Sequence, residues 1–180
     1  FKDNQPKAAV PGGSVFNGII SLGRAGANVT FISEVGGDKV GNIILDFMKD
    51  NGVKTDNVVV YPDRKSPVSL AFLNEKNDAE YIFYKDYPNL RLDADMPEVT
   101  GDDIVMIGSF YAITPQLRDK VKELLDKARK AGAIIYYDVN FRKTHAHEAI
   151  KLMPIILENF EYADIVRGSN EDFGFMFGIT

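Results

Sequence analysis

Two groups of polar residues in this chain have the types and spacing that suit chemistry on a small polar ligand. In the first, Gly12 and Gly13 come directly before a helical pattern, and Asn17 falls on the first turn of that helix. Glycines let the backbone approach a ligand closely, and a helix N-terminus offers unpaired N–H groups. The asparagine adds a donor and an acceptor, which suit hydroxyl groups. The alternative is that the glycines only form a tight loop.

The second group is Asp138, Asn140 and Arg142, which follow the apolar run 134–137 at alternate positions. Alternate residues of a strand point to one side, so we expect these three side chains to converge beyond a buried strand. The guanidinium of Arg142 suits an anionic group because it donates through a planar fork. The alternative is an Asp–Arg pair that only holds a loop.

A third candidate is Asn170-Glu171-Asp172, which comes just after another predicted strand. Carboxylates at this position suit magnesium, either directly or through water. The alternative is helix capping, with Ser169 or Asn170 as the N-cap and the acids in the first turn. On physical grounds alone capping is slightly favoured.

An aromatic stripe is predicted in the middle of the chain. Tyr81, Phe83 and Lys85 alternate with other residues of a β-like run, so they share one face. Such a face covers a ligand, packs against a partner subunit, or belongs to a core. Several other chemistries lack their motifs: the chain has no G-x-S-x-G elbow, no Walker-type phosphate loop and no G-x-G-x-x-G fingerprint.

Composition limits the class of protein. The chain has 180 residues, of which 45% are hydrophobic and 26% are charged, which is ordinary for a globular domain. There is no cysteine, so disulfides and thiolate metal sites are excluded. The net charge of −5 argues against a nucleic-acid surface, and no apolar run reaches the length of a membrane span. We expect a cytoplasmic protein.

The order of elements indicates how these residues are positioned. Helical spacing of apolar residues is seen at 13–25, 38–51, 114–132, 147–159 and 171–177, and β-like runs at 28–33, 58–61, 68–74, 80–85, 103–108, 133–138 and 163–166. Thr114-Pro115 reads as a helix start and Pro154 as a kink or a late start. The runs at 58–61, 68–74 and 80–85 have no helix between them, which predicts a small antiparallel sheet. Elsewhere strands and helices alternate, which predicts a doubly wound α/β fold with a mostly parallel sheet and helices on both faces.

Several of these segments together resemble one family. The series Gly12-Gly13, Asn17, Gly26, Gly36-Gly37-Asp38 and Gly41 resembles the N-terminal signature of ribokinase-like (PfkB-type) carbohydrate kinases. The segment 138–142 is similar to the family's D-x-N-x-R segment, which is typical of fructokinases and ketodeoxygluconate kinases, and 169–172 falls where the family has N-x-x-E. The chain departs from the pattern at Val15 and Ile19, where the signature usually has small residues. With Asn170 as the motif asparagine, the glutamate position is Phe173, and Glu171 or Asp172 would take that role or the register would shift.

The resemblance implies an α/β core at 1–56 and 90–180, with an inserted β-sheet lid at 57–89. It implies transfer of the γ-phosphate of ATP to a sugar hydroxyl, with Mg²⁺, on fructose or a related sugar or sugar acid. It also implies site residues: substrate contacts from Gly12, Gly13, Asn17, Phe83, Tyr84, Lys85, Asn140 and Arg142; a cofactor contact from Asn170; and metal contacts from Glu171 and Asp172.

The same resemblance implies that the first strand precedes Phe1 and that the catalytic base follows Thr180. We therefore expect no catalytic base in these 180 residues, and no activity from them alone. Two alternatives stay open: a non-catalytic sugar-binding or regulatory module, and a nucleoside kinase of the same family. The exposed edges and apolar face of the inserted sheet predict a homodimer that pairs through residues 57–86.

Overall fold

The computed structural model describes residues 1–2, 5–6, 8–75, 79–141 and 143–178. These divide into two compact units, one of residues 1–13 and 19–94, the other of 14–18 and 95–180. The predicted lid, 57–89, falls wholly within the first unit. No helix in the described ranges has the length and apolar character needed to cross a membrane.

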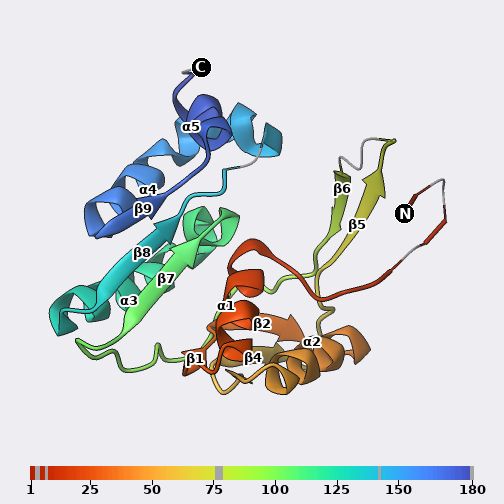
Figure 1. The fold of residues 1–180 in the computed structure, drawn as a ribbon, viewed down its shortest axis with the longest axis horizontal. Coiled ribbons are helices and arrows are strands. Elements are labelled where there is room, and N and C mark those ends of the chain that lie inside the picture. The colour runs from red at the N-terminus through yellow and green to blue at the C-terminus, as the bar shows by residue number, and fades with distance from the viewer. Residues whose placement is uncertain (3–4, 7, 76–78, 142, 179–180) are drawn as a thin grey trace. The chain divides into compact units, whose positions relative to one another are not determined.

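The first unit holds two parallel strand pairs, a hairpin, one whole helix and the end of another (Figure 1). Its strands are β1 (Val29–Thr30), β2 (Ser33–Gly36), β3 (Val53–Lys54), β4 (Val58–Tyr61), β5 (Val68–Leu73) and β6 (Ala79–Tyr84), and its whole helix is α2 (Lys39–Asp50). Strand β1 pairs with β3, and β2 pairs with β4, both in parallel. The predicted single strand 28–33 is therefore wrong: the chain forms two short strands with different partners, and β3 was missed.

Strands β5 and β6 form an antiparallel hairpin in which Ser69 lies opposite Phe83 and Ala71 opposite Tyr81. The Phe1 backbone extends this hairpin, because its amino group donates to the Ala71 carbonyl at 2.6 Å and its carbonyl accepts from Leu73 N at 2.9 Å. The predicted antiparallel sheet of three strands is wrong in one respect. Strand β4 pairs in parallel with β2, so the hairpin alone is the antiparallel part.

Helix α2 shows how local sequence fixes the first unit. Asp38 is its N-cap, and its carboxylate accepts from Gly41 N at 2.8 Å. The same carboxylate accepts from Ser66 N at 3.0 Å and from Ser66 Oγ at 2.8 Å. These hydrogen bonds lower the pKa of Asp38, the largest cause being the one from Gly41. The cap therefore also holds the start of the hairpin against the end of β2.

The second unit is built on three parallel strands that lie side by side in the order β7 (Ile104–Gly108), β8 (Ile134–Asp138) and β9 (Ile165–Arg167) (Figure 1). Its helices are α3 (Arg118–Ala131), α4 (Ala149–Tyr162) and α5 (Asn170–Phe177), with 3-10 helices at Phe110–Ile113, Pro115–Leu117 and Lys143–Glu148. Helix α1 (Ser14–Arg24) begins in this unit and ends in the first.

Alternating side chains of these strands build the core of the second unit. Val105, Ile107, Ile135 and Tyr137 are buried, and the Tyr137 ring packs on Phe160 of α4 with ring centroids 5.7 Å apart. Gly132 ends α3 in the left-handed conformation. Thr114 is the N-cap of a 3-10 turn with Pro115 at its first position, which confirms the predicted helix start. The turn ends at Leu117, and the α-helix itself begins at Arg118. Pro154 lies inside α4, which begins at Ala149. This alternation of parallel strands and helices confirms the predicted α/β class.

Candidate functional site

The carboxyl ends of β7, β8 and β9 meet at one edge of the sheet and bring Asp138 and Arg167 together there. Gly108 is paired in register with Asp138, and Asp138 with Arg167, so the last residues of the three strands lie side by side. In open α/β sheets this edge is where ligands bind. The polar groups gathered here are the candidate site of the second unit.

Asp138 lies at the centre of this edge. Its carboxylate is buried and accepts from Ser14 Oγ at 3.2 Å and from Arg167 Nη1 at 2.9 Å. The hydrogen bond and charge of Asp138 raise the pKa of Arg167, whose side chain is 67% exposed. Among the described residues, the arginine paired with Asp138 is Arg167. The predicted contact residue Arg142 lies outside the described residues.

Asn140 follows Asp138 by two positions but does not continue the strand. Strand β8 ends at Asp138, and Asn140 has a φ of 41°, in the left-handed region. The alternation predicted for Asp138 and Asn140 is therefore wrong, because that rule holds only for extended backbone. The Asn140 amide instead turns toward β7 and donates through Nδ2 to Ser109 Oγ at 3.3 Å.

The glycine motif and Asn17 are divided between the two units. Gly13 is the N-cap of α1 with a φ of 144°, a conformation that favours glycine, and it groups with the first unit as Gly12 does. Asn17 is exposed on the first turn of α1 and groups with the second unit. Asn17 therefore shares its unit with Asp138 and Asn140.

The predicted lid residues end the hairpin of the first unit. Phe83 and Tyr84 are neighbours in β6, so their exposed side chains point to opposite faces of the hairpin. Lys85 Nζ lies 5.3 Å from the centroid of the Phe83 ring, which is a cation–π contact. Burial, and then the charge of Arg91, lower the pKa of Lys85. Phe83 and Lys85 thus share a face that combines an aromatic ring with a cation.

The start of α5 shows the capping that the sequence favoured. Ser169 is the N-cap; its Oγ accepts from Asp172 N at 3.1 Å, while Asp172 Oδ2 accepts from Ser169 N at 2.7 Å. This reciprocal pair is a capping box. Its i, i+3 spacing matches that of N-x-x-E, with Ser169 and Asp172 at the two ends. Asn170 and Glu171 are exposed on the first turn.

At the start of α5, the side chains that could contact magnesium are the carboxylates of Glu171 and Asp172. Among the described residues, no set of three or more His, Cys, Asp or Glu side chains is placed to hold a metal ion. Asp172 is buried and engaged with Ser169, whereas the Glu171 carboxylate is exposed. Magnesium bound with a nucleotide needs only one or two protein carboxylates, because phosphates and waters complete its shell. Glu171 therefore fits a water-mediated role.

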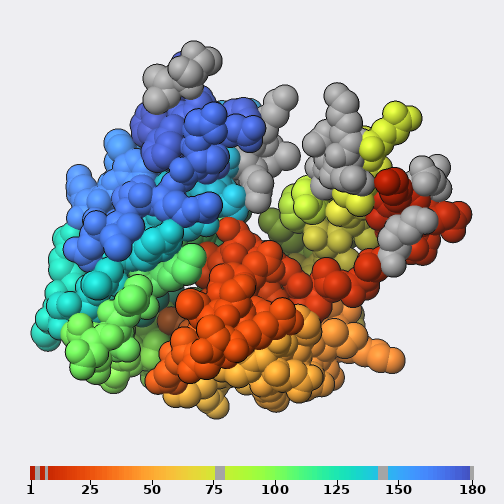
Figure 2. Space-filling view, in the orientation of Figure 1, coloured from red at the N-terminus to blue at the C-terminus, as the bar shows by residue number. Residues whose placement is uncertain are grey.

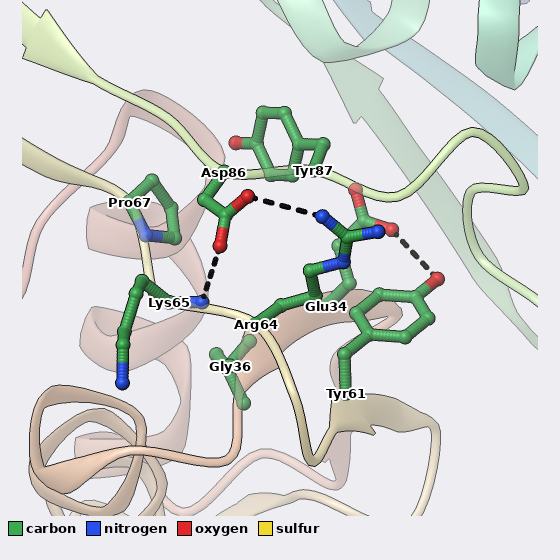
Figure 3. Close-up of a pocket in the computed structure, with 9 residues that line it drawn as sticks. Glu34, Gly36, Tyr61, Arg64, Lys65, Pro67, Asp86 and Tyr87 are labelled. Atoms are coloured by element: carbon green, nitrogen blue, oxygen red, sulfur yellow. Dashed lines mark hydrogen bonds and ion pairs between the residues drawn. The ribbon is translucent and has the colours of Figure 1, made fainter.

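The first unit has a small pocket at the carboxyl ends of β2 and β4 (Figure 3). Asp86 accepts there from Lys65 N at 3.1 Å and from Arg64 Nη1 at 3.3 Å, and Tyr61 donates to Glu34 at 3.1 Å. The space between these residues is about 170 Å³ with open solvent included, and it encloses no room for a ligand. These contacts tie the two ends of the hairpin together, and we assign the pocket to the base of the hairpin.

Sequence reasoning missed two residues of the candidate site, Ser109 and Arg167. Each of them directly follows a predicted strand, 103–108 for Ser109 and 163–166 for Arg167. A polar residue at a strand end is also the signal that picked out Asp138. Neither stood out because each is a single polar residue without a neighbouring motif. Ser14, which donates to Asp138, directly follows the Gly12-Gly13 pair.

Comparison with known proteins identifies the family of this chain. The family model for pfkB family carbohydrate kinases matches residues 8–180, and the chain belongs to this family. Over 171 residues it is 28% identical to a probable fructokinase-6, chloroplastic, of Arabidopsis thaliana, covering 92% of this chain and 44% of that protein. Over 173 residues it is 27% identical to fructokinase-1 of Zea mays, covering 94% and 54%. The chain thus spans about half the length of these relatives.

Among solved structures, the fold is similar to that of a fructokinase from Vibrio cholerae O395. The apo form superposes with a TM-score of 0.83 at 18% identity, covering 98% of this chain and 62% of that one. The form with bound fructose, ADP and calcium ion has a TM-score of 0.80, covering 94% and 56%. These neighbours confirm the ribokinase-like fold.

Proposed function

We propose that this chain is part of an ATP-dependent sugar kinase that transfers the γ-phosphate to a hydroxyl of fructose or a related sugar or sugar acid. The observation that carries the proposal is the gathering of Ser14, Asp138 and Asn140 at the carboxyl edge of the sheet in a pfkB family chain. Membership of the family and the fructokinase relatives support a sugar as the acceptor.

The residues of the second unit would bind and orient the sugar. Asn17 and Asn140 each offer an amide that donates and accepts, which matches the hydroxyls of a polyol. Asp138 would not act as a base in this scheme, because its two oxygens are already engaged by Ser14 and Arg167. Its role would be to fix the start of α1 beside the end of β8. Arg142 would meet an anionic group of the substrate or the phosphate in transfer.

The lid would exclude water from the reacting groups. Gly12 and Gly13 would let the backbone pass close to the sugar, and Phe83, Tyr84 and Lys85 would close over it. In phosphoryl transfer the protein mainly positions the reactants and neutralises charge, so a closing lid and well-oriented amides are the parts that matter.

The nucleotide and its metal would bind on the α5 side, with Asn170 near the phosphates and Glu171 or Asp172 on the metal side. When bound, Mg²⁺ neutralises the charge on the phosphates. Fructose and ADP in the Vibrio cholerae fructokinase structure support this choice of ligands. We further propose a cytoplasmic homodimer that pairs through the hairpin.

The experiment is a coupled ADP-release assay on the full-length protein with fructose, ribose and ketodeoxygluconate. We expect turnover on one of them, and a rise of about tenfold or more in its KM in Asn17→Ala. The matched control is Asn42→Ala, an exposed asparagine on α2, which should leave KM unchanged. A wild-type protein inactive on a wide panel of hexoses, pentoses and keto-sugar acids would contradict the proposal.

The second candidate is a sugar-binding or regulatory module without catalysis. The start of α5 favours this candidate, because Asp172, three residues after Ser169, is engaged in helix capping. Its signature would be thermal stabilisation by a sugar without ADP release, and loss of that stabilisation in Asn17→Ala.

A further inference from the structure

We propose that Ser109 is a positioning residue that holds the Asn140 amide in place in the sugar site. This inference rests on the proposed function, and nothing in the motifs of the sequence points to Ser109. It follows from two residues with unusual backbone conformations at the ends of neighbouring strands.

Ser109 has a conformation in which glycine is the ordinary choice. Its φ is 55° and its ψ is −162°, a region that is almost reserved for glycine and is strained for any residue with a Cβ. Relief of that strain would require only the loss of a hydroxymethyl group. A serine at this position therefore indicates that the hydroxyl has a use.

The backbone around Ser109 is fixed by its neighbours. Ser109 N donates to the Asp138 carbonyl at 2.9 Å, which extends the pairing of β7 and β8 by one residue. A Cβ at the preceding Gly108 would lie 2.6 Å from the same carbonyl oxygen, so the two strand ends approach each other closely. The Ser109 hydroxyl is thus held at a set position relative to β8.

The partner of that hydroxyl is Asn140. Asn140 Nδ2 lies 3.3 Å from Ser109 Oγ, and Asn140 is itself in the left-handed region with a φ of 41°. Within the described residues its amide has no other hydrogen-bond partner. The contact with Ser109 leaves one N–H and the carbonyl oxygen of the amide for a ligand.

An asparagine amide presents a donor at one end and an acceptor at the other, and a half turn about its terminal bond exchanges them. The Ser109 hydroxyl can accept from the N–H end or donate to the carbonyl end, so the contact holds the amide in place whichever end faces it. Ser109 therefore fixes where the Asn140 amide lies relative to a sugar hydroxyl. This is a positioning role, because the ligand then meets an amide that is already held.

The test compares Ser109→Gly with Ser109→Ala in the full-length protein. Both remove the hydroxyl, but glycine relieves the backbone strain and alanine keeps it. We expect the melting temperature of Ser109→Gly to equal or exceed that of the wild type, and that of Ser109→Ala to fall below it. Both variants should nevertheless raise the KM for the preferred sugar about tenfold, with kcat changed less than about threefold.

A second readout does not depend on activity. In the wild type, the side-chain amide of Asn140 should give one ordered pair of NMR signals, and in Ser109→Gly these should broaden or average. In an Asn140→Ala background, Ser109→Gly should add nothing to the rise in KM, because the two residues act as one unit.

A stable Ser109→Gly variant with wild-type KM and an unchanged Asn140 amide would overturn the inference. Failure of the proposed function looks different: the wild type would phosphorylate no sugar, and the amide signals would still report whether Ser109 holds Asn140 in place.

Discussion

Tyr137 of β8 is completely buried, and among the described residues its hydroxyl has no hydrogen-bond partner. Burial raises the pKa of Tyr137 to about 12, and the nearby Asn159 and Arg118 offset only part of that rise. In the unfolded chain the same phenol ionises near pH 10. Stability from the neutral phenol is therefore fully present below pH 10 and is lost as the pH rises toward 12.

We expect this residue to remove about 3 kcal/mol of the free energy of unfolding between pH 10 and pH 12. The matched variant is Tyr137→Phe, which keeps the ring against Phe160 and removes the ionisable group. Urea titrations at a series of pH values should show a shallower alkaline decline in the variant. Identical slopes in the two proteins would contradict the assignment.

Two arginine–carboxylate pairs of the first unit differ in burial. Arg91 pairs with Glu34, and both side chains are buried; Arg91 Nε lies 2.5 Å from the Glu34 carboxylate, and its guanidinium stacks on Tyr87 at 3.5 Å. Arg64 pairs with Asp86, with exposed fractions of 45% and 43%. Breaking a buried pair leaves an uncompensated charge, whereas an exposed pair is screened by water.

Arg91→Leu should therefore lower the free energy of unfolding by about 3 kcal/mol, and Arg64→Leu should change it by less than about 1 kcal/mol. The double variant Glu34→Gln, Arg91→Leu should recover part of the loss, because no buried carboxylate is left unpaired. Equal effects of the two single arginine changes, measured by urea unfolding, would show that burial does not separate the pairs.

At the scale of elements, two helical glycines have opposite surroundings. A Cβ on Gly41 of α2 would collide with the Gly36 carbonyl and come within 2.9 Å of Ser66 Oγ. A Cβ on Gly18 of α1 would meet only the Met106 side chain, at 3.7 Å. The start of α2 is thus packed closely against the end of β2, whereas α1 has room for a methyl group at Gly18.

Gly41→Ala should destabilise the protein by more than about 2 kcal/mol, because backbone must move to admit the methyl group. Gly18→Ala should stabilise it by up to about 1 kcal/mol through helix propensity. Thermal unfolding of both variants checks the pair. A stable Gly41→Ala would mean that α2 can move away from β2 at little cost.

The helices and their ends could be predicted from the sequence because their signals are local. Asp38 caps α2, Gly132 ends α3 and Ser169 caps α5, and each acts within a few residues. Strand partners could not be predicted in the same way. The run 58–61 reads as a strand, but nothing in its own residues says that it pairs with β2.

The candidate site was predictable to the same extent. Asp138 and Asn140 could be picked out as polar residues at the end of a buried strand. Where their side chains point could not be predicted, because the left-handed backbone at Asn140 breaks the strand alternation. Arg167 and Ser109 come to Asp138 and Asn140 from strands far apart in the sequence. Such contacts depend on the register of the parallel sheet, which only the folded chain reveals.

At the scale of the whole molecule, the hairpin carries more exposed apolar surface than a two-stranded element supports in water. Its side chains lie at the surface in yellow to yellow-green in Figure 2. By strand alternation, one face carries Val68, Ile82 and Tyr84, and the other carries Tyr81 and Phe83, all of them exposed. An isolated hairpin is marginally stable at best, so both faces need cover.

The two faces differ in chemistry, which assigns them different roles in the proposed homodimer. The face with Tyr81 and Phe83 has stacked rings 5.9 Å apart and the Lys85 cation, and it suits a polar ligand. The face with Val68, Ile82 and Tyr84 combines aliphatic and aromatic side chains, and we expect it to pair with another copy of the chain. In light scattering at micromolar concentration, we expect the full-length protein to be a dimer and Ile82→Asp to be a monomer.

The matched variant is Tyr81→Asp, on the neighbouring position of the same strand with a similarly exposed side chain, 52% against 45% for Ile82. It should stay dimeric and lose affinity for the sugar, because it alters the other face. A monomeric wild type would refute pairing through the hairpin. Each substitution places one charge on one side of the same sheet. If the dimer persists in Ile82→Asp but is lost in Tyr81→Asp, the face with Tyr81 is the dimer interface and the face with Ile82 is not.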